Sequence, residues 1–150
     1  MIGNPSSQIP SIRHIYKLLC QHCKSLVCVR GMKAILLANN RIDLYSTDVP
    51  SSSICVLYRH YLKDTCQCRI QDTACLECGN ILGYHIISPC LSCLNASHNG
   101  HLWMFRSEEC DTIERYDINQ KLMYWPNAPK IEIDLELKTE SYISHHLLYR

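Results

Sequence analysis

Two pairs of cysteines, each separated by two residues, limit most strongly how this chain can fold. Cys20 and Cys23 form the first pair, and Cys75 and Cys78 form the second. A tight turn between paired cysteines can place both sulfurs on one ion, and two pairs complete the tetrahedral four-thiolate shell of a structural zinc site. Gly79 follows Cys78 directly, where such a turn often needs a positive φ. We predict a closed zinc site here, called site 1, with redox or buried thiols as the alternative.

A second zinc site, called site 2, is predicted from a less regular set of thiols. Its four residues are Cys66, Cys68, Cys90 and Cys93. The first two are separated by one residue only, which is a less usual geometry for a zinc pair. His98 and His101 follow closely, and either could replace one of the four ligands. Free thiols, buried or facing solvent, are the alternative to a second zinc.

The remaining cysteines and the start of the chain indicate a reducing compartment. Eleven cysteines is an odd count, and the first twenty residues lack the apolar run of a secretory signal. Under reducing conditions paired cysteines hold metal more often than they form bridges. Cytoplasmic and nuclear localisation is therefore expected. The unpaired cysteines are predicted to be small buried hydrophobic residues: Cys28, Cys55 and Cys110.

Composition favours one folded domain and argues against several ligand classes. The chain has 150 residues, of which 47% are apolar and 19% are charged. Its net charge is +1 without a basic cluster, so direct binding to nucleic acid is not expected. No apolar run is long enough to span a membrane. A small-molecule substrate is not expected either.

The apolar patterning predicts a mainly β, or α+β, fold. Strands are expected at Met32–Ala38, Ile42–Tyr45, Ile54–Leu62, Ile81–Ile87 and Leu102–Phe105. Residues 12–19 fit a short helix or a strand, and residues 108–123 have spacing compatible with a helix. From Ile131 to Leu137, apolar and charged residues alternate, which predicts an edge strand.

The positions of prolines, serines and cysteines predict how the chain is divided into domains. Residues 1–11, with two prolines and three serines, are expected to be a flexible lead-in. Residues 12–125 are expected to form the zinc-binding β-rich domain. Residues 126–150, which begin at Pro126, are expected to be a tail that contains the edge strand.

Enzymatic signatures are incomplete in this sequence. Cys90 and Cys93, preceded by Pro89, match half of the zinc deaminase signature, but the His-x-Glu half is missing. A thiol-dependent oxidoreductase would need an exposed cysteine of low pKa outside the zinc sites. Cys28, Cys55 and Cys110 are the only candidates, and none has an activating context. We therefore predict a protein that binds another protein and has no catalytic residues.

Several long strings of the sequence resemble the "family with sequence similarity 72" proteins. The resemblance extends from about Leu19 to Phe105 and returns near Trp125. The strings that carry it are Arg30–Ala38, Ile42–Pro50, Ala74–His85, Pro89–Cys93, Asn99–Phe105 and Trp125–Pro129. These proteins look like relatives of the β-tent zinc folds, so the resemblance implies two small antiparallel sheets that meet near zinc.

The resemblance also implies a partner. The best-known proteins of this kind bind nuclear uracil-DNA glycosylase, antagonise it and promote its degradation, which alters base-excision repair. The tryptophan of their Trp-x-Asn-x-Pro segment takes part in binding, and Trp125 is the matching residue here. From the residues alone, Trp125 beside two prolines fits an exposed anchor or the lid of a small core equally well. Degradation of a different client is an alternative function.

Overall fold

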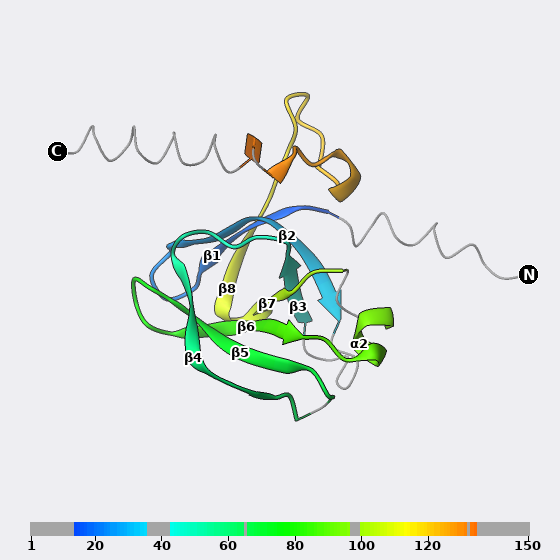
Figure 1. The fold of residues 1–150 in the computed structure, drawn as a ribbon. Helices are drawn as coiled ribbons and strands as arrows, with labels where there is room; N and C mark the ends of the chain where they lie inside the picture. The colour runs from blue at the N-terminus through cyan, green and yellow to red at the C-terminus, as the bar shows by residue number, and fades with distance from the viewer. Residues whose placement is uncertain (1–13, 36–42, 65, 97–99, 132, 135–150) are drawn as a thin grey trace, which may run out of the picture.

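The structure is a single antiparallel sheet of eight strands with few helices (Figure 1). It is a computed structural model that describes residues 14–35, 43–64, 66–96, 100–131 and 133–134. The strands lie in the order β4-β5-β6-β7-β3-β2-β1-β8. Their bounds are β1 (Tyr16–Cys20), β2 (Leu26–Ile35), β3 (Asp43–Thr47), β4 (Ile54–Leu62), β5 (Arg69–Cys75), β6 (Ile81–Ser88), β7 (Trp103–Arg106) and β8 (Cys110–Glu114).

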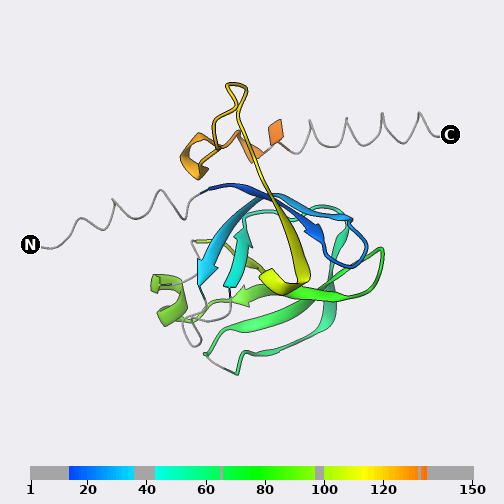
Figure 2. The ribbon, with the colours of Figure 1, turned by 180° about the vertical axis from the view of Figure 1, so that it is seen from behind.

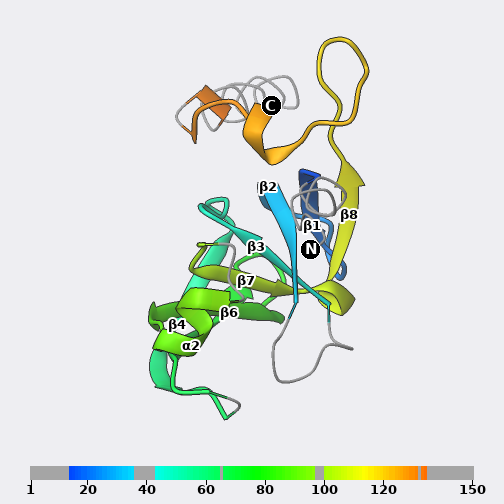
Figure 3. The same ribbon diagram turned by 90° about the vertical axis from the view of Figure 1, so that its right-hand side faces the viewer.

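The long strand β2 joins two parts of the sheet. Its first half pairs with β1, where Leu18 lies opposite Cys28. Its second half pairs with β3, where Ala34 lies opposite Leu44. In the side view, β1, β2 and β8 lie on one side of the molecule and β4 to β7 lie on the other (Figure 3). The mainly β class is confirmed, and the two expected sheets are two parts of one continuous sheet.

The core divides into two clusters, and each contains cysteines of one predicted zinc site. Fully buried Leu18, Leu82 and Phe105 belong to the first cluster, which also contains Cys20 and Cys75. The second cluster is built around Ile86 and Met104 and also contains the site 2 residues Cys68 and Cys93. Each site therefore continues directly into apolar packing.

Gly83 allows β6 and β7 to approach closely. A Cβ at this position would lie 2.0 Å from the carbonyl oxygen of Met104 and 2.8 Å from Cα of Phe105. Both obstacles are backbone atoms, so they cannot move aside as a flexible side chain could. A side chain at position 83 would therefore push apart the strands that carry Met104 and Phe105 into the core.

The predicted strands agree with the structure where it describes them. Ile54–Leu62 is β4 as expected, Ile81–Ile87 falls within β6, and Leu102–Phe105 overlaps β7. The ambiguous segment at residues 12–19 contributes to strand β1. The lead-in predicted at residues 1–11 lies outside the described residues. The sequence reading missed β5 and the short helix α2 (Leu91–Ala96).

Two predictions for the last third of the chain differ from the structure where it describes them. The helix-compatible segment 108–123 begins in a 3-10 turn, η2 (Ser107–Glu109), and continues as strand β8, which pairs with β1. Beyond β8 the chain forms a hairpin that stands off the sheet (Figure 2), with Tyr116 bridged to Leu122. In the predicted edge strand, the described residues Ile131, Ile133 and Asp134 are helical. Residues 135–150 lie outside the description.

The helices of the described ranges are short. None of them is long and apolar enough to cross a membrane.

Candidate metal centres

Site 1 is built from two turns of the same shape. In the first, the amide of Lys24 donates to the carbonyl of Cys20 (2.8 Å), and the amide of Cys20 donates to the carbonyl of Ser25 (2.8 Å). In the second turn, Gly79 donates to Cys75 (2.7 Å), and Cys75 donates to Asn80 (3.0 Å). Lys24 and Gly79 have φ of 66° and 80°, respectively. The expected positive φ after Cys78 is confirmed, and Lys24 adopts it in the other turn.

The two turns bring the four thiols of site 1 together. The sulfurs of Cys20 and Cys78 are 3.7 Å apart, and those of Cys23 and Cys75 are 3.5 Å apart. All four sulfurs lie within 4.8 Å of one another. Four thiolates bound to one zinc at about 2.3 Å would stand about 3.8 Å apart. The donor set therefore fits a tetrahedral zinc ion in both distance and chemistry.

Site 2 gathers its thiols from the β4–β5 turn, the short connection after β6 and helix α2. The Cys68 and Cys90 sulfurs are 3.6 Å apart, and the amide of Cys90 donates to the Cys68 sulfur (3.3 Å). Together with Cys66 and Cys93, these sulfurs also lie within 4.8 Å of one another. Cys68 and Cys93 are buried, and the other two are half-buried. The one-residue spacing thus does not prevent a four-sulfur cluster, and both tetrads can bind zinc.

Of the two histidines considered as replacement ligands, only His101 is described, and it does not enter the cluster at site 2. His101 is buried elsewhere, with its Nδ1 atom 2.8 Å from the hydroxyl of Ser46. His98 lies outside the described residues. The four thiols are therefore the ligand set that the described residues provide at site 2.

The thiols of site 1 differ in acidity according to their surroundings. Burial raises the pKa of Cys20 to about 12 and also raises the pKa of Cys75. Hydrogen bonding to the Ser25 side chain, 3.2 Å away, lowers the pKa of Cys23 to about 6. The Asn80 amide donates to the Cys78 sulfur (3.2 Å) and lowers the pKa of that thiol. Zinc binding would therefore start from the more acidic thiols of Cys23 and Cys78 and displace protons from the buried pair.

The thiols of site 2 also differ in acidity, with the pKa raised for two of them and lowered for one. Burial raises the pKa of Cys68, and burial also raises the pKa of Cys93 to about 11. Backbone amides lower the pKa of Cys90 to about 6, with the amide of Cys93 contributing most. Each tetrad thus combines two thiols held neutral by burial with at least one thiol prepared to ionise. A bound zinc supplies the positive charge that stabilises all four thiolates.

The hairpin formed by β5 and β6 spans the two sites. β5 starts directly after Cys68 of site 2 and ends at Cys75 of site 1. β6 starts shortly after Cys78 of site 1 and ends two residues before Cys90 of site 2. In Figure 1 the β5–β6 turn and helix α2 accordingly lie at opposite ends of this hairpin. The sequence reading predicted both sites but not this strand pair between them.

Surface contacts tie the first turn to the segment around β8. The His22 Nε2 atom lies 2.7 Å from a carboxylate oxygen of Glu109, and Lys24 forms an ion pair with Asp111. The backbone amide of Gln21 also donates to the carbonyl of Glu109 (3.0 Å). The His-containing loop of site 1 is therefore held by contacts that the cysteine spacing could not reveal.

The three cysteines outside the tetrads are placed largely as expected. Cys28 and Cys110 are buried, and burial raises the pKa of each to about 12. Cys55 is half-buried, and its sulfur lies 3.5 Å from the carbonyl oxygen of Ala74. None of the eleven cysteines forms a disulfide.

Trp125 is neither fully exposed nor buried. It begins the 3-10 turn η3 (Trp125–Asn127), and its ring centroid lies 4.7 Å from that of His101. In a second contact of the Trp125 ring, the guanidinium carbon of Arg30 lies 5.0 Å from the ring centroid. Trp103 is half-buried in β7 and stacks on His85, with ring centroids 4.0 Å apart. Trp125 therefore combines a packed side with accessible surface.

Comparison with known proteins identifies the fold and the family of this chain. The crystal structure of the Mis18 "Yippee-like" domain is similar, with a TM-score of 0.52 and 13% sequence identity over 69% of this chain and 99% of that chain. This likeness shows a Yippee-like fold. The family described as "Yippee homolog 2 zinc finger protein" matches residues 9–148. Because that match covers nearly the whole sequence and both tetrads suit zinc, the chain belongs to the Yippee homolog 2 zinc finger protein family.

Proposed function

We propose that this zinc protein acts without catalysis by binding a nuclear uracil-DNA glycosylase, antagonising it and promoting its degradation. Its two tetrads would each hold a zinc that stabilises the fold, because four thiolates leave no ligand position for water or substrate. Membership of the "family with sequence similarity 72" proteins, suggested by the sequence strings, supports this choice of partner. Cytoplasmic and nuclear residence goes with the same proposal.

Trp125 is the observation that supports this role best. Its ring contacts both Arg30 and His101, and the residue remains partly accessible. Large aromatic side chains held in place in this way often dominate binding energy at protein interfaces. The described residues before and after it include further exposed or partly exposed apolar side chains: Ile113, Tyr116, Ile118, Ile131 and Ile133. An apolar surface of this kind fits a protein partner.

The alternative of a thiol-dependent oxidoreductase receives less support. Such chemistry needs a thiolate outside the metal sites. Burial raises the pKa of Cys28 and Cys110 to about 12, so both remain protonated and covered near neutral pH. Cys55 would be the remaining candidate, and profiling thiol reactivity in the zinc-loaded protein would test it. A faster reaction at Cys55 than at a free thiol would favour the oxidoreductase.

Capture of purified uracil-DNA glycosylase by the full, zinc-loaded chain tests the proposed partner. We expect Trp125→Ala to reduce capture at least tenfold, as loss of an interface hot spot does. Tyr58→Ala is the matched control, because Tyr58 is a 97% exposed aromatic residue on the edge strand β4, whereas Trp125 contacts Arg30 on β2. Absence of capture by the wild-type chain would reject the glycosylase. Equal loss in both variants would reject Trp125 as the specific contact.

A further inference from the structure

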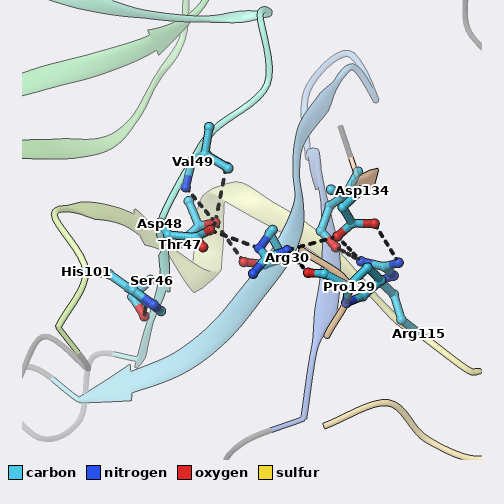
Figure 4. Close-up of polar contacts among 10 residues, drawn as sticks. Arg30, Ser46, Thr47, Asp48, Val49, His101, Arg115, Pro129 and Asp134 are labelled. Carbon is cyan, nitrogen blue, oxygen red and sulfur yellow. Dashed lines mark hydrogen bonds and ion pairs between the residues drawn. The ribbon is translucent and has the colours of Figure 1, made fainter. Parts of the chain in front are cut away.

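A buried network of charges connects the chain beyond Trp125 to the zinc-binding domain (Figure 4). Asp134 is 3% exposed, and both its carboxylate oxygens accept hydrogen bonds from Arg115, at 2.9 and 3.0 Å. Arg30, in the middle of β2, lies 3.4 Å from the same carboxylate. It also donates to the backbone carbonyl of Pro129 at 2.7 Å. Arg30 and Arg115 thus hold this segment at two residues, Pro129 and Asp134.

The same arginine contacts Trp125. Arg30 Nε donates to Asp48 at 3.1 Å, which fixes the near end of the guanidinium group. The backbone carbonyl of Arg30 accepts a hydrogen bond from the Thr47 hydroxyl at 2.7 Å. With its orientation fixed from both sides, the guanidinium faces the ring of Trp125. Stacking of arginine on tryptophan is favourable when the cation is shielded from water.

The network is balanced in charge. Arg30 and Arg115 carry two positive charges, and Asp48 and Asp134 carry two negative charges. A buried ion that loses its partner is strongly unfavourable, so the arrangement is stable only when the segment is in place. Arg115 further donates to the carbonyl of Val29 (2.8 Å), which anchors it to β2.

We propose that Arg30, Arg115 and Asp134 form a clasp that closes the segment 125–134 onto β2 and thereby positions Trp125 for its partner. These three are positioning residues, since they act through the tryptophan. This role rests on the proposed partner binding through Trp125. Opening the clasp would leave the indole attached to the domain but free to sample orientations that the partner does not fit, and binding would carry the cost of ordering it again.

Indole accessibility tests the clasp without any partner. In a Trp103→Phe background, Trp125 is the single tryptophan, because the chain contains two. We expect Asp134→Asn to raise acrylamide quenching of Trp125 about twofold or more, since the indole would leave a partly covered site. Asp111→Asn is the matched control, because Asp111 has an exposed ion pair with Lys24. Zinc content and the far-ultraviolet circular dichroism spectrum report whether each variant is folded.

Arg115 offers a second route if Asp134→Asn fails to fold. Arg115→Gln removes the two-point contact to Asp134 and leaves Arg30 in place, whereas Arg115→Lys keeps the charge. We expect the glutamine variant to raise quenching and to weaken capture of the glycosylase about tenfold, with zinc content unchanged. The lysine variant should recover part of both effects. A purely architectural role would change the melting temperature without this coupled loss and recovery of capture.

Two results would overturn the clasp, and a third would reject the partner alone. Quenching that stays at the wild-type value in both Asp134→Asn and Arg115→Gln would show that the network does not hold Trp125. Increased quenching with unchanged capture would show that orientation of Trp125 is irrelevant to binding. If the wild-type chain captures no glycosylase, the proposed partner fails, and unchanged quenching would then reject the clasp separately.

Discussion

The sulfur of Cys23 lies 3.5 Å from the sulfur of Cys75, although 52 positions separate the two residues in the chain. This contact joins the β1–β2 turn to the β5–β6 turn, two elements that share no backbone pairing. Zinc binding contributes about 10–16 kcal/mol in small zinc domains, which is comparable with or larger than the stability of many whole domains. The position of one half of the sheet relative to the other thus depends on site 1.

Removal of a site 1 ligand should unfold the protein. We expect Cys75→Ser to abolish zinc binding at site 1 and to remove the cooperative thermal transition, because a buried thiolate shell with three members loses most of its metal affinity. Native mass spectrometry and circular dichroism on the same sample provide the readouts. A Cys75→Ser protein that melts like the wild type would contradict a structural zinc at this site.

The zinc count should distinguish site 2 from a group of free thiols. We expect two zinc ions in the wild-type chain and one in Cys68→Ser, measured by native mass spectrometry. Cys55→Ser is the matched control, since Cys55 is half-buried on β4 and belongs to neither tetrad. It should retain both ions. One zinc in the wild-type chain, with no further loss in Cys68→Ser, would argue against the second site.

Gly83→Ala should be among the most destabilising single methyl additions. The new Cβ would stand 2.0 Å from the carbonyl oxygen of Met104, so the β6–β7 pair must separate. We expect a loss of about 3 kcal/mol, the upper end of what overpacking normally costs, from urea unfolding of the zinc-loaded protein. Gly100→Ala is the control, with a φ of 78° and nothing near its Cβ. It should cost about 1–2 kcal/mol through backbone strain alone, and similar losses in the two variants would contradict the steric explanation.

Acidification should weaken the packing around Trp125 through His101. Burial lowers the pKa of His101 below its usual 6.5; nearby Asp48 opposes this shift and Arg30 adds to it. The neutral ring is therefore favoured in the folded state, so its stabilising contribution is complete above about pH 6.5 and is lost as the pH falls through the lowered pKa. His101→Asn retains a group that can bond to Ser46 but does not titrate in this range. We expect the stability difference between the wild type and this variant, measured by urea unfolding, to shrink between pH 7.5 and pH 5.5; a constant difference would exclude His101.

The sequence predicted those parts of the molecule whose causes are local. β4 and β6 are rich in apolar and aromatic residues, and the Cys-x-x-Cys turns carry their own geometry. β5 was missed because Arg69–Cys75 has little apolar alternation, and it becomes a strand by pairing with β4 on one side and β6 on the other. Tertiary pairing likewise overrides the helical spacing after Glu108, where β8 pairs with β1.

The clasp illustrates what a linear pattern cannot reveal. The alternation of isoleucine and acidic residues from Ile131 onward is typical of a strand, yet the described part is a helical turn. Asp134 takes its place there because two arginines, one of them 104 positions earlier, need a carboxylate. Nothing in the neighbourhood of Arg30 or of Asp134 in the sequence indicates that they meet.

With one tetrad at each end, the β5–β6 hairpin sets the distance and the orientation between the two tetrads. One residue added to either strand would advance that strand by about 3.3 Å and turn its later side chains to the opposite face. That displacement exceeds the length of a zinc–sulfur bond, about 2.3 Å. After a single insertion, one tetrad could therefore keep its geometry only if the other tetrad lost its geometry. Natural length variation in this protein should accordingly fall outside the stretch between Cys68 and Cys90.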